Sequence, residues 1–552
     1  MMQNKTMINR SLNYKNSYVN LDPRLYHRQP PTPLSNPRAG HFNPIIAKQL
    51  GWDKDPELMA RWVDILGGSY VPEGFAPLSM AYAGHQFGQW AGQLGDGRGL
   101  LMAQVIDNEG ELKDLHLKGA GLTPYSRMGD GRAVLRSTIR EYLCGHAMSS
   151  LGIRSSSSLG FVTSDTAVRR ETVEQGAALM RVADTHIRLG HVEWIASFAP
   201  DLLPSFTQYM IETYYPELTT SQTPVADFIS EVVTSTAVMI ADWQLIGFAH
   251  GVMNTDNLSI TGTTLDYGPF GFLERFDPAW INNHSDYSGR YAYQNQPAIA
   301  HWNLNVWMMH FMQLSGKSLF NGIKETLSRE VLANCLAKYE PSFMRHYQKG
   351  ICKKLGLSWD YLSSHSSSTE PLSREPSSNE AETINETLKL AFELLEIVES
   401  NKLDYTNSFR ALIAVVDADN YPYEAGLLQQ IDSELDSEQL TVWHQWRQRY
   451  LSHIEKVAAT HKLNPDAEIA NTSADSAKAA VIEQLTQSNP VYVLRNAMAQ
   501  RAIEQAQSGD FSEVDRLFQL LTTPYQLHGL ATKQDITPPN RTAKPLVISC
   551  SS

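Results

Sequence analysis

The chain has 552 residues, of which 42% are hydrophobic and 9% aromatic, so it can bury a sizeable core and is not mostly disordered. At roughly 150 residues per domain, this length allows about three or four domain-sized units. Lys and Arg number 46 against 59 Asp and Glu, which gives a formal net charge of −13. A chain this acidic is a poor general binder of nucleic acid, because neutralising phosphates takes concentrated basic residues. A local basic pocket for a nucleotide remains compatible with this charge.

The cysteines and the apolar segments indicate where the protein works. Four scattered cysteines without a Cys-x-x-Cys pair exclude a disulfide scaffold and a zinc ribbon, and they suit a reducing compartment. The first twenty residues lack the apolar segment of a secretory signal. Polar residues interrupt the most apolar stretch, 232–249, and no run reaches the roughly 18 apolar residues of a membrane span. We therefore expect a cytoplasmic protein that binds neither membrane nor nucleic acid, in an oligomeric state that the sequence does not indicate.

The order of the predicted elements divides the chain into four parts. Residues 1–75 are polar and rich in proline near residue 30, and they predict an extended N-terminal wrap. Short strands with one helix are expected over 76–190, and mainly helices over 191–480. Residues 481–552 predict a helical extension and a tail. Within the helical part, the Ser-, Glu- and Pro-rich stretch 363–382 predicts a low-complexity insertion, because such residues cannot build a core.

The first region that indicates chemistry begins with four glycines between residues 92 and 99. A β-hairpin is expected next, with strands over 100–107 and 112–119. Leucines alternate with polar residues in the second strand, which predicts Lys118 at the end of a half-buried strand, on the face opposite the leucines. A helix expected over 132–149 places Glu141 near its middle. Glycines allow backbone N–H groups to approach phosphates, the Lys supplies charge, and a buried Glu fixes the Lys geometry.

Each of these signals has an ordinary structural explanation when it is taken alone. A lysine in a strand is usually a solvated edge charge, and we weight that interpretation of Lys118 about three to one. Asp130 would serve equally well as the N-cap of the helix expected after it. The glycine cluster would be explained by ordinary turns. The order of the glycines, Lys118 and Glu141 along the chain is what favours a nucleotide site.

The second region lies over 228–268, where an amphipathic helix is followed by a predicted tight hairpin. Asp256 and Asn257 precede the hairpin and Asp266 follows it. Carboxylate and amide oxygens suit Mg²⁺, which takes few protein ligands together with substrate phosphates. Asp266 is followed by Tyr and Gly, as in the metal-binding turn of protein kinases.

Together the two regions follow the order of protein-kinase motifs, with one departure. In kinases the catalytic Asp lies five residues before the metal-binding Asn. Here that position is Val252, and Asp256 is the only nearby carboxylate able to act as a base. The kinase motifs do not require the three further arginines Arg98, Arg181 and Arg188. Arginine suits bidentate phosphate contacts, although surface ion pairs would also account for Arg181 and Arg188.

Several long segments closely resemble the selenoprotein O family: 82–99, 116–143, 181–191, 247–278 and 489–518. The resemblance spans nearly the whole chain and implies an α+β, bilobal protein-kinase-like fold, with a β-rich N-lobe and a mainly helical C-lobe. It implies a pseudokinase that transfers AMP from ATP to Ser, Thr or Tyr hydroxyls of proteins and releases pyrophosphate. Mg²⁺, with Mn²⁺ as an alternative, would be the cofactor. The nucleotide would be inverted relative to kinases, so that the α-phosphorus meets the acceptor.

The resemblance also implies roles for individual residues. Lys118, held by Glu141, would bind phosphate, and Asp256 would be the general base. Asn257 and Asp266 would hold the metal, with Asp266 also near the nucleotide. The remaining expected nucleotide contacts are Gly95, Gly97, Arg98, Asp130, Gly131, Arg181 and Arg188.

Two other functions stay open at this point. A kinase that transfers the γ-phosphoryl group would use Asp256 as a displaced base, and a silent scaffold would bind nucleotide without chemistry. Val252 and the surplus arginines count against the first, and the complete set of candidate metal ligands counts against the second. Cys550 precedes two terminal serines, where the family's selenium-containing members carry selenocysteine, so it is a candidate redox or attachment site or an idle thiol.

Overall fold

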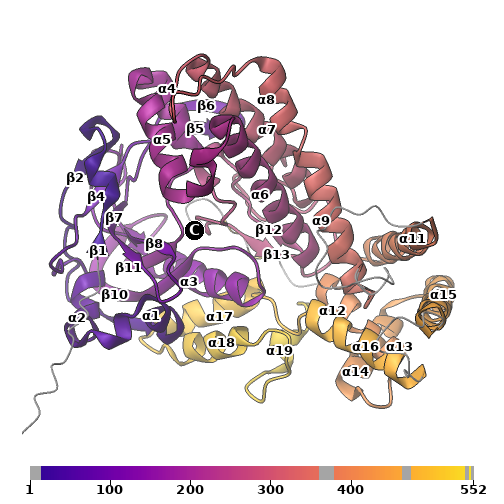
Figure 1. The fold of residues 1–552 in the computed structure, drawn as a ribbon. Helices are drawn as coiled ribbons and strands as arrows, with labels where there is room; N and C mark the ends of the chain where they lie inside the picture. Colours follow the sequence, from indigo (N-terminus) through magenta and orange to yellow (C-terminus); the bar gives the residue numbers. More distant parts are fainter. Residues whose placement is uncertain are drawn as a thin grey trace, which may run out of the picture.

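The structure is a computed structural model, which describes residues 14–357, 359, 378–462, 474–540, 546 and 548. A lobe built on a large β-sheet is followed along the chain by a helical lobe, and further helices extend from the second lobe and pack beneath the first (Figure 1). This confirms the predicted α+β, bilobal class. Cys550 and residues 363–377 of the predicted insertion lie outside the described residues, whereas residues 378–382 already belong to a helix.

The large sheet of the first lobe is antiparallel throughout, in the order β2-β4-β7-β8-β11-β10-β3, with β1 added beside β7 and β9 beside β11. Its strands are β1 (Tyr14–Lys15), β2 (Tyr26–Arg28), β3 (Arg38–Phe42), β4 (Leu78–Met80), β7 (Gly99–Ile106), β8 (Leu112–Lys118), β9 (Ala133–Val134), β10 (Ser157–Arg169) and β11 (Val173–Ala183). Two separate two-stranded sheets are β5 (Ala83–Gln86) with β6 (Gln89–Gln93), and β12 (Phe248–Ala249) with β13 (Gly271–Phe272).

The predicted half-buried strand around Lys118 is buried on both faces instead. Leu115 and Leu117 of β8 lie in an apolar core on one side of the sheet. His116 and Lys118 alternate with them and line a cavity on the other side, with exposed fractions of only 2% and 6%. A strand with polar residues on one face looks amphipathic in sequence, but here that face meets the second lobe rather than water. The edge-charge interpretation of Lys118 is therefore wrong.

The segment expected to be an extended wrap also contains two helices. The helix α1 (Pro44–Leu50) follows strand β3, and α2 (Pro56–Leu66) comes next. Asn43 and Asp55 cap them, each accepting hydrogen bonds from two backbone N–H groups in the first turn, and a proline opens both helices. Pro44 and Pro56 are thus helix starts, whereas the prolines near residue 30 lie outside any helix. Both helices add apolar residues to the core on the Leu115 side of the sheet.

Helices make up the rest of the described chain. The helix expected over 132–149 is α3 and begins at residue 135, because the two residues before it pair with β11 as β9. Its N-cap is Val134, so Asp130 is not the cap. Near the C-terminus, α17 and α18 pack against α3, which places these two helices of the predicted helical extension, 481–552, under the first lobe (Figure 1). The helices are α3 (Leu135–Ser150), α4 (Leu189–Phe198), α5 (Leu203–Tyr214), α6 (Pro224–Ile246), α7 (Gln296–Met308), α8 (Arg329–Leu336), α9 (Tyr339–Lys354), α11 (Ser378–Ser400), α12 (Tyr405–Arg410), α13 (Leu412–Val416), α14 (Pro422–Glu434), α15 (Ser437–Lys462), α16 (Ala474–Ser488), α17 (Asn496–Gln507), α18 (Ser512–Thr522) and α19 (Lys533–Ile536).

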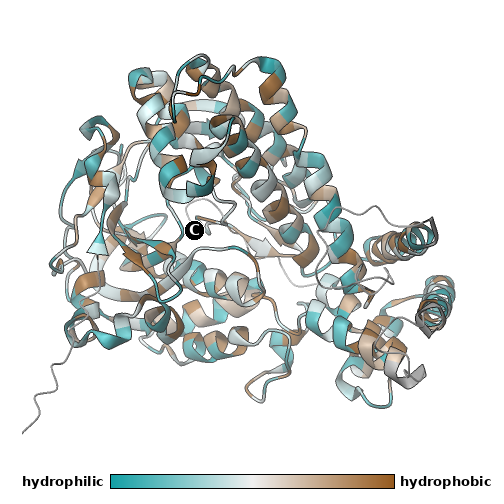
Figure 2. Cartoon of the chain, viewed as in Figure 1, coloured by the Kyte–Doolittle hydropathy of each residue, from teal (hydrophilic) through white to brown (hydrophobic). Residues whose placement is uncertain are grey.

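The helix α6 is the central helix of the second lobe, with α7, α8 and α9 packed against it. Most helices carry alternating polar and apolar bands, as expected for surface helices with one buried stripe (Figure 2). Among the described residues α6 alone is long and apolar enough to cross a membrane, but 72% of its most apolar window is buried inside the protein. That burial is typical of a core helix.

Candidate active site

A cavity of about 590 Å³ brings the predicted site residues together. The sheet and the loops after β6 and β8 contribute one wall, and the loops between α6 and β13 contribute the opposite wall. Glu141 is the one predicted site residue that does not line the cavity, since it lies behind Lys118. The predicted residues in the lining are Gly95, Gly97, Arg98, Lys118, Asp130, Gly131, Arg181, Arg188, Asp256, Asn257 and Asp266.

A continuous chain of ion pairs connects the two lobes across this cavity. Glu141 of α3 pairs through one carboxylate oxygen with Lys118 of β8 and through the other with Arg181 of β11. Arg181 also pairs with one oxygen of Asp266, and Arg188 pairs with the other. The expected contact between Lys118 and Glu141 is therefore present. Arg181 and Arg188 are each 3% exposed, so they are not the surface ion pairs that the sequence left open.

The charges in this network shift one another's pKa values. Burial would raise the pKa of Asp266, but Arg181, Arg188 and Lys118 outweigh it and hold that pKa well below its usual range. Burial likewise opposes ionisation of Glu141, whose pKa is nevertheless lowered by Arg181 and Lys118. Burial lowers the pKa of Lys118 to about 8, although Glu141 favours its charged form. The cavity thus concentrates positive charge against ionised carboxylates, an arrangement suited to a polyanionic ligand.

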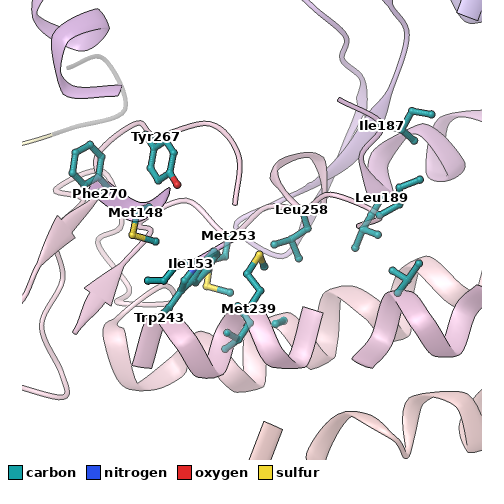
Figure 3. Close-up of a cluster of buried hydrophobic side chains, with 14 of the residues drawn as sticks. Met148, Ile153, Ile187, Leu189, Met239, Trp243, Met253, Leu258, Tyr267 and Phe270 are labelled. Carbon is teal, nitrogen blue, oxygen red and sulfur yellow. The ribbon is translucent and has the colours of Figure 1, made fainter. Parts of the chain in front are cut away.

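Buried apolar neighbours hold the polar site residues in place. Ile187 and Leu189 flank Arg188 and are at most 1% exposed. Tyr267 follows Asp266 and is equally buried, while Asp266 itself has a positive φ of 59°, a region that only a few per cent of residues other than glycine adopt. Figure 3 shows Ile187, Leu189 and Tyr267 in one buried apolar cluster with Met148, Ile153, Met239, Trp243, Met253, Leu258 and Phe270. The positive φ of Asp266 is therefore held beside a fully buried neighbour, Tyr267, which anchors the loop in this cluster.

Asp256 lies in a short 3₁₀ turn, Thr255–Asn257, and is 7% exposed. The Gln86 side-chain amide of β5 donates to its Oδ2 at 3.2 Å, whereas its buried Oδ1 has no hydrogen-bond partner. Gly84 allows β5 to pack this closely, because a Cβ there would lie 2.9 Å from both Asp256 Oδ1 and Thr255 Oγ1. Burial raises the pKa of Asp256 to about 6, against the opposing effect of Arg188. A carboxylate with this pKa is well suited to accept a proton near neutral pH.

Asn257 and Asp266 line the same cavity and could hold a metal ion. The Asn257 side-chain nitrogen donates to the Val252 carbonyl oxygen at 3.0 Å, which leaves the side-chain oxygen for another contact. Within the described residues, no group of three or more His, Cys, Asp or Glu is placed to hold a metal ion. One amide oxygen and one carboxylate nevertheless fit Mg²⁺, which usually completes its shell with substrate phosphates and water. The ion pairs of Asp266 would have to adjust to share that carboxylate.

Two glycines of the cavity lining, Gly95 and Gly131, occupy positions where a side chain would not fit. Gly95 has φ of 141°, and a Cβ there would lie 2.4 Å from the Tyr125 ring. Gly131 has φ of 71°, and a Cβ there would lie 2.1 Å from the carbonyl carbon of Gly121. Asp130 accepts a hydrogen bond from the Arg132 backbone N–H at 2.9 Å, and it pairs with Arg170 at 2.8 Å. Its carboxylate is thus held at the cavity edge.

Sequence reasoning missed several residues that line the cavity. Gln86, His116 and Tyr125 all fall within or beside the segments that carried the family resemblance, but no kinase motif assigns them a role. Arg170 lies in the turn between β10 and β11, which nothing in the sequence connected to a nucleotide. Gln86 and Asp256 are 170 residues apart, so only the fold shows that they touch.

Known proteins are similar to this chain over nearly its whole length. The model of the family "Protein adenylyltransferase SelO" matches residues 9–522. The chain belongs to the SelO family. A protein of Vibrio vulnificus, named protein nucleotidyltransferase YdiU, is 40% identical over 546 residues, covering 98% of this chain and 99% of the relative. Proteins of the same name from Aliivibrio salmonicida and Vibrio cholerae are 39% and 40% identical, over 98% and 95% of this chain and 99% and 95% of their own lengths.

Proposed function

We propose that the protein transfers AMP from ATP to Ser, Thr or Tyr hydroxyls of target proteins. The acceptor oxygen forms a bond to the α-phosphorus of ATP, and the bond from that phosphorus to the bridging oxygen of the β-phosphate breaks. Asp256 takes the hydroxyl proton, and pyrophosphate leaves with the bonding electrons. The products are an AMP–protein phosphodiester and pyrophosphate. Both family membership and the names of the relatives support nucleotidyl transfer.

The single observation that most supports AMP transfer is the placement of charge in the cavity. Arg98, Lys118, Arg181 and Arg188 line it together, which suits the terminal phosphates and a departing pyrophosphate better than a neutral adenine ring. Asp256 and Val252 line the same cavity, where Arg188 donates to the Asp256 carbonyl oxygen at 2.7 Å, and Val252 occupies the position of the usual kinase base. With the terminal phosphates among the cations, the α-phosphorus is the one left near Asp256. This is the inverted orientation that the family resemblance implies.

Asn257 and Asp266 would hold Mg²⁺, or Mn²⁺ as an alternative. When bound, such an ion neutralises phosphate charge and stabilises a leaving pyrophosphate. The residues of the chain do the rest: Lys118 and the arginines orient the phosphates, and Asp256 positions the acceptor hydroxyl and receives its proton. Gln86 fixes the Asp256 carboxylate by its hydrogen bond to Oδ2.

Label transfer from ATP carrying ³²P at the α or the γ position tests the proposal. The purified protein is incubated with Mg²⁺ and a cell extract, and Asp266→Ala and Asp256→Asn serve as inactive variants. Asp165→Asn is the matched control, because Asp165 is half exposed, pairs with Arg38 and lies outside the cavity lining. We expect protein to be labelled from the α position alone, by the wild type and the control but not by the two site variants.

The other outcomes would identify the competing functions. Label from the γ position alone would mean a kinase with Asp256 as a displaced base. No label from either position, with ATP still bound, would mean a nucleotide-binding scaffold. Label retained in Asp256→Asn would remove Asp256 from the role of base.

A further inference from the structure

His116 is a buried histidine of the cavity whose ring nitrogens both lack a hydrogen-bond partner. Its side chain is 3% exposed, yet it is part of the cavity lining. Buried polar groups in folded proteins almost always have a hydrogen-bond partner, and leaving one without a partner destabilises the fold. The buried His146, by contrast, bonds through its ring nitrogen to Thr522 at 2.9 Å. An unpartnered imidazole that borders a cavity indicates that its partner is a ligand.

The neighbours of His116 are the cations already described. It is directly opposite Arg181 in the antiparallel pairing of β8 with β11, and Lys118 lies two residues further along its own strand. Side chains opposite each other on neighbouring strands, and two apart on one strand, share a face of the sheet. His116, Lys118 and Arg181 therefore form one row on the cavity side. A phosphate held by two of them lies against the third.

Gly99 makes room for the nitrogen-bearing edge of the His116 ring. A Cβ at Gly99 would lie 2.3 Å from His116 Cε1, 3.0 Å from Nε2 and 3.3 Å from Nδ1. The edge with both nitrogens thus faces the backbone where the glycine loop ends. Any larger residue at this position would displace the ring.

Two further groups fix the ring from other sides. Asp96 Oδ1 lies 3.4 Å from His116 Nε2, and the ring of His186 stacks on it with centroids 4.5 Å apart and planes inclined by 17°. Burial lowers the pKa of His186 to about 4, with His116 adding to the effect, so His186 stays neutral and adds no charge. Asp96 and an anion in the cavity are both acceptors, and a neutral imidazole donates to one of them while a ring protonated on both nitrogens donates to both. The ring is thus oriented before any ligand arrives.

We propose that His116 donates a hydrogen bond to a terminal phosphate oxygen of the bound nucleotide. It would make the site selective for nucleoside triphosphates and pyrophosphate over nucleoside monophosphates. The proposal rests on the proposed function in placing the terminal phosphates beside Lys118 and Arg181. His116 is a binding residue here and takes no part in bond making or breaking.

Calorimetric binding of ATP, inorganic pyrophosphate and AMP tests the proposal. His116→Leu removes the donor, and His116→Gln keeps an N–H donor on a flexible chain. Loss of a hydrogen bond to a charged group predicts that His116→Leu binds ATP and pyrophosphate about tenfold or more weakly, with AMP affinity unchanged. His116→Gln should recover part of that loss. In turnover, the KM for ATP should rise while kcat changes little.

A measurement on the unaltered protein guards against a variant that fails to fold. Pyrophosphate should slow exchange of the Cε1 hydrogen of His116 with deuterium, followed by mass spectrometry, and leave His146 unchanged. Equal weakening of AMP and ATP in His116→Leu, unchanged affinity for all three ligands, or unaltered exchange at His116 would each overturn the proposal. The calorimetric binding and hydrogen-exchange measurements need no transfer reaction. Weakened pyrophosphate binding without α-label transfer in the wild type would therefore overturn the proposed function and leave this inference standing.

Discussion

Replacing the two partners of the Lys118–Glu141 ion pair should affect stability very differently. Glu141 is 2% exposed, and its two oxygens face Lys118 and Arg181. Glu141→Gln leaves Lys118 as a buried cation without its directly paired carboxylate, since Asp266 pairs with the two arginines. Removing one partner of a buried pair typically costs about 3–5 kcal/mol. We expect a loss of that size in the free energy of unfolding, measured without nucleotide.

Lys118→Met should cost far less, because it leaves no unpaired charge behind. Glu141 keeps its ion pair with Arg181. The Lys118 pKa is lowered from 10.5 to about 8, and a shift of this size means that its charged form is destabilised in the folded protein by about 3 kcal/mol. The variant no longer bears that cost. We expect its stability to lie within about 1 kcal/mol of the wild type or above it, while α-label transfer is lost because the phosphate contact is gone.

The same residue predicts a pH dependence of known sign. Between pH 8 and 10.5 the unfolded chain keeps the Lys118 proton and the folded chain loses it. The unfolded state then binds more protons, so this residue makes stability rise with pH in that window. Urea unfolding of the wild type and of Lys118→Met is measured across this window. The free energy of unfolding of the wild type should increase with pH relative to that of the variant. Equal destabilisation by Lys118→Met and Glu141→Gln, or a difference that does not change with pH, would refute the reasoning.

Three further changes test other parts of the structure. Asp256→Asn should lower the α-label transfer rate by about 10²–10⁴-fold while the affinity for ATP is retained. Because the base must be deprotonated to accept a proton, the wild-type rate should rise with pH through the Asp256 pKa of about 6. Gly84→Ala should reduce transfer with little change in ATP binding, because its Cβ would lie 2.9 Å from Asp256 Oδ1; wild-type rates would contradict the close packing. Lys354→Met should raise the unfolding temperature measured by calorimetry, because burial destabilises the charged Lys354 and lowers its pKa to about 7. The Lys354 Nζ lies 4.4 Å from the Phe409 ring centroid, and a lower unfolding temperature in the variant would mean that this ring contact outweighs the cost of burial.

Local patterns in the sequence predicted the parts of the site that depend on neighbouring residues. Alternation along a strand placed Lys118 opposite the leucines, and helical spacing placed Glu141 inside α3. The turn containing Asp266 was visible from the three residues that form it. The helices α1 and α2 were missed, because proline and short length concealed two well-capped helices. The start of α3 was placed too early, because the pairing of β9 with β11 is not a local property.

By itself, the sequence determined that a strand-rich part precedes a mainly helical part, the order of the glycine loop and of the charged residues, and the missing kinase base at Val252. Each follows from residue type and spacing, which act over one strand or one helical turn. Only the tertiary structure decided which charges meet: Arg188 and Asp266 are 78 residues apart, and Gln86 and Asp256 are 170 residues apart. It also decided that the polar face of β8 borders a cavity rather than water, which places Lys118 in the cavity lining and leaves both ring nitrogens of His116 without a hydrogen bond. Burial of that face comes from the packing of two lobes, and the pattern of a single strand is the same whichever surface covers it.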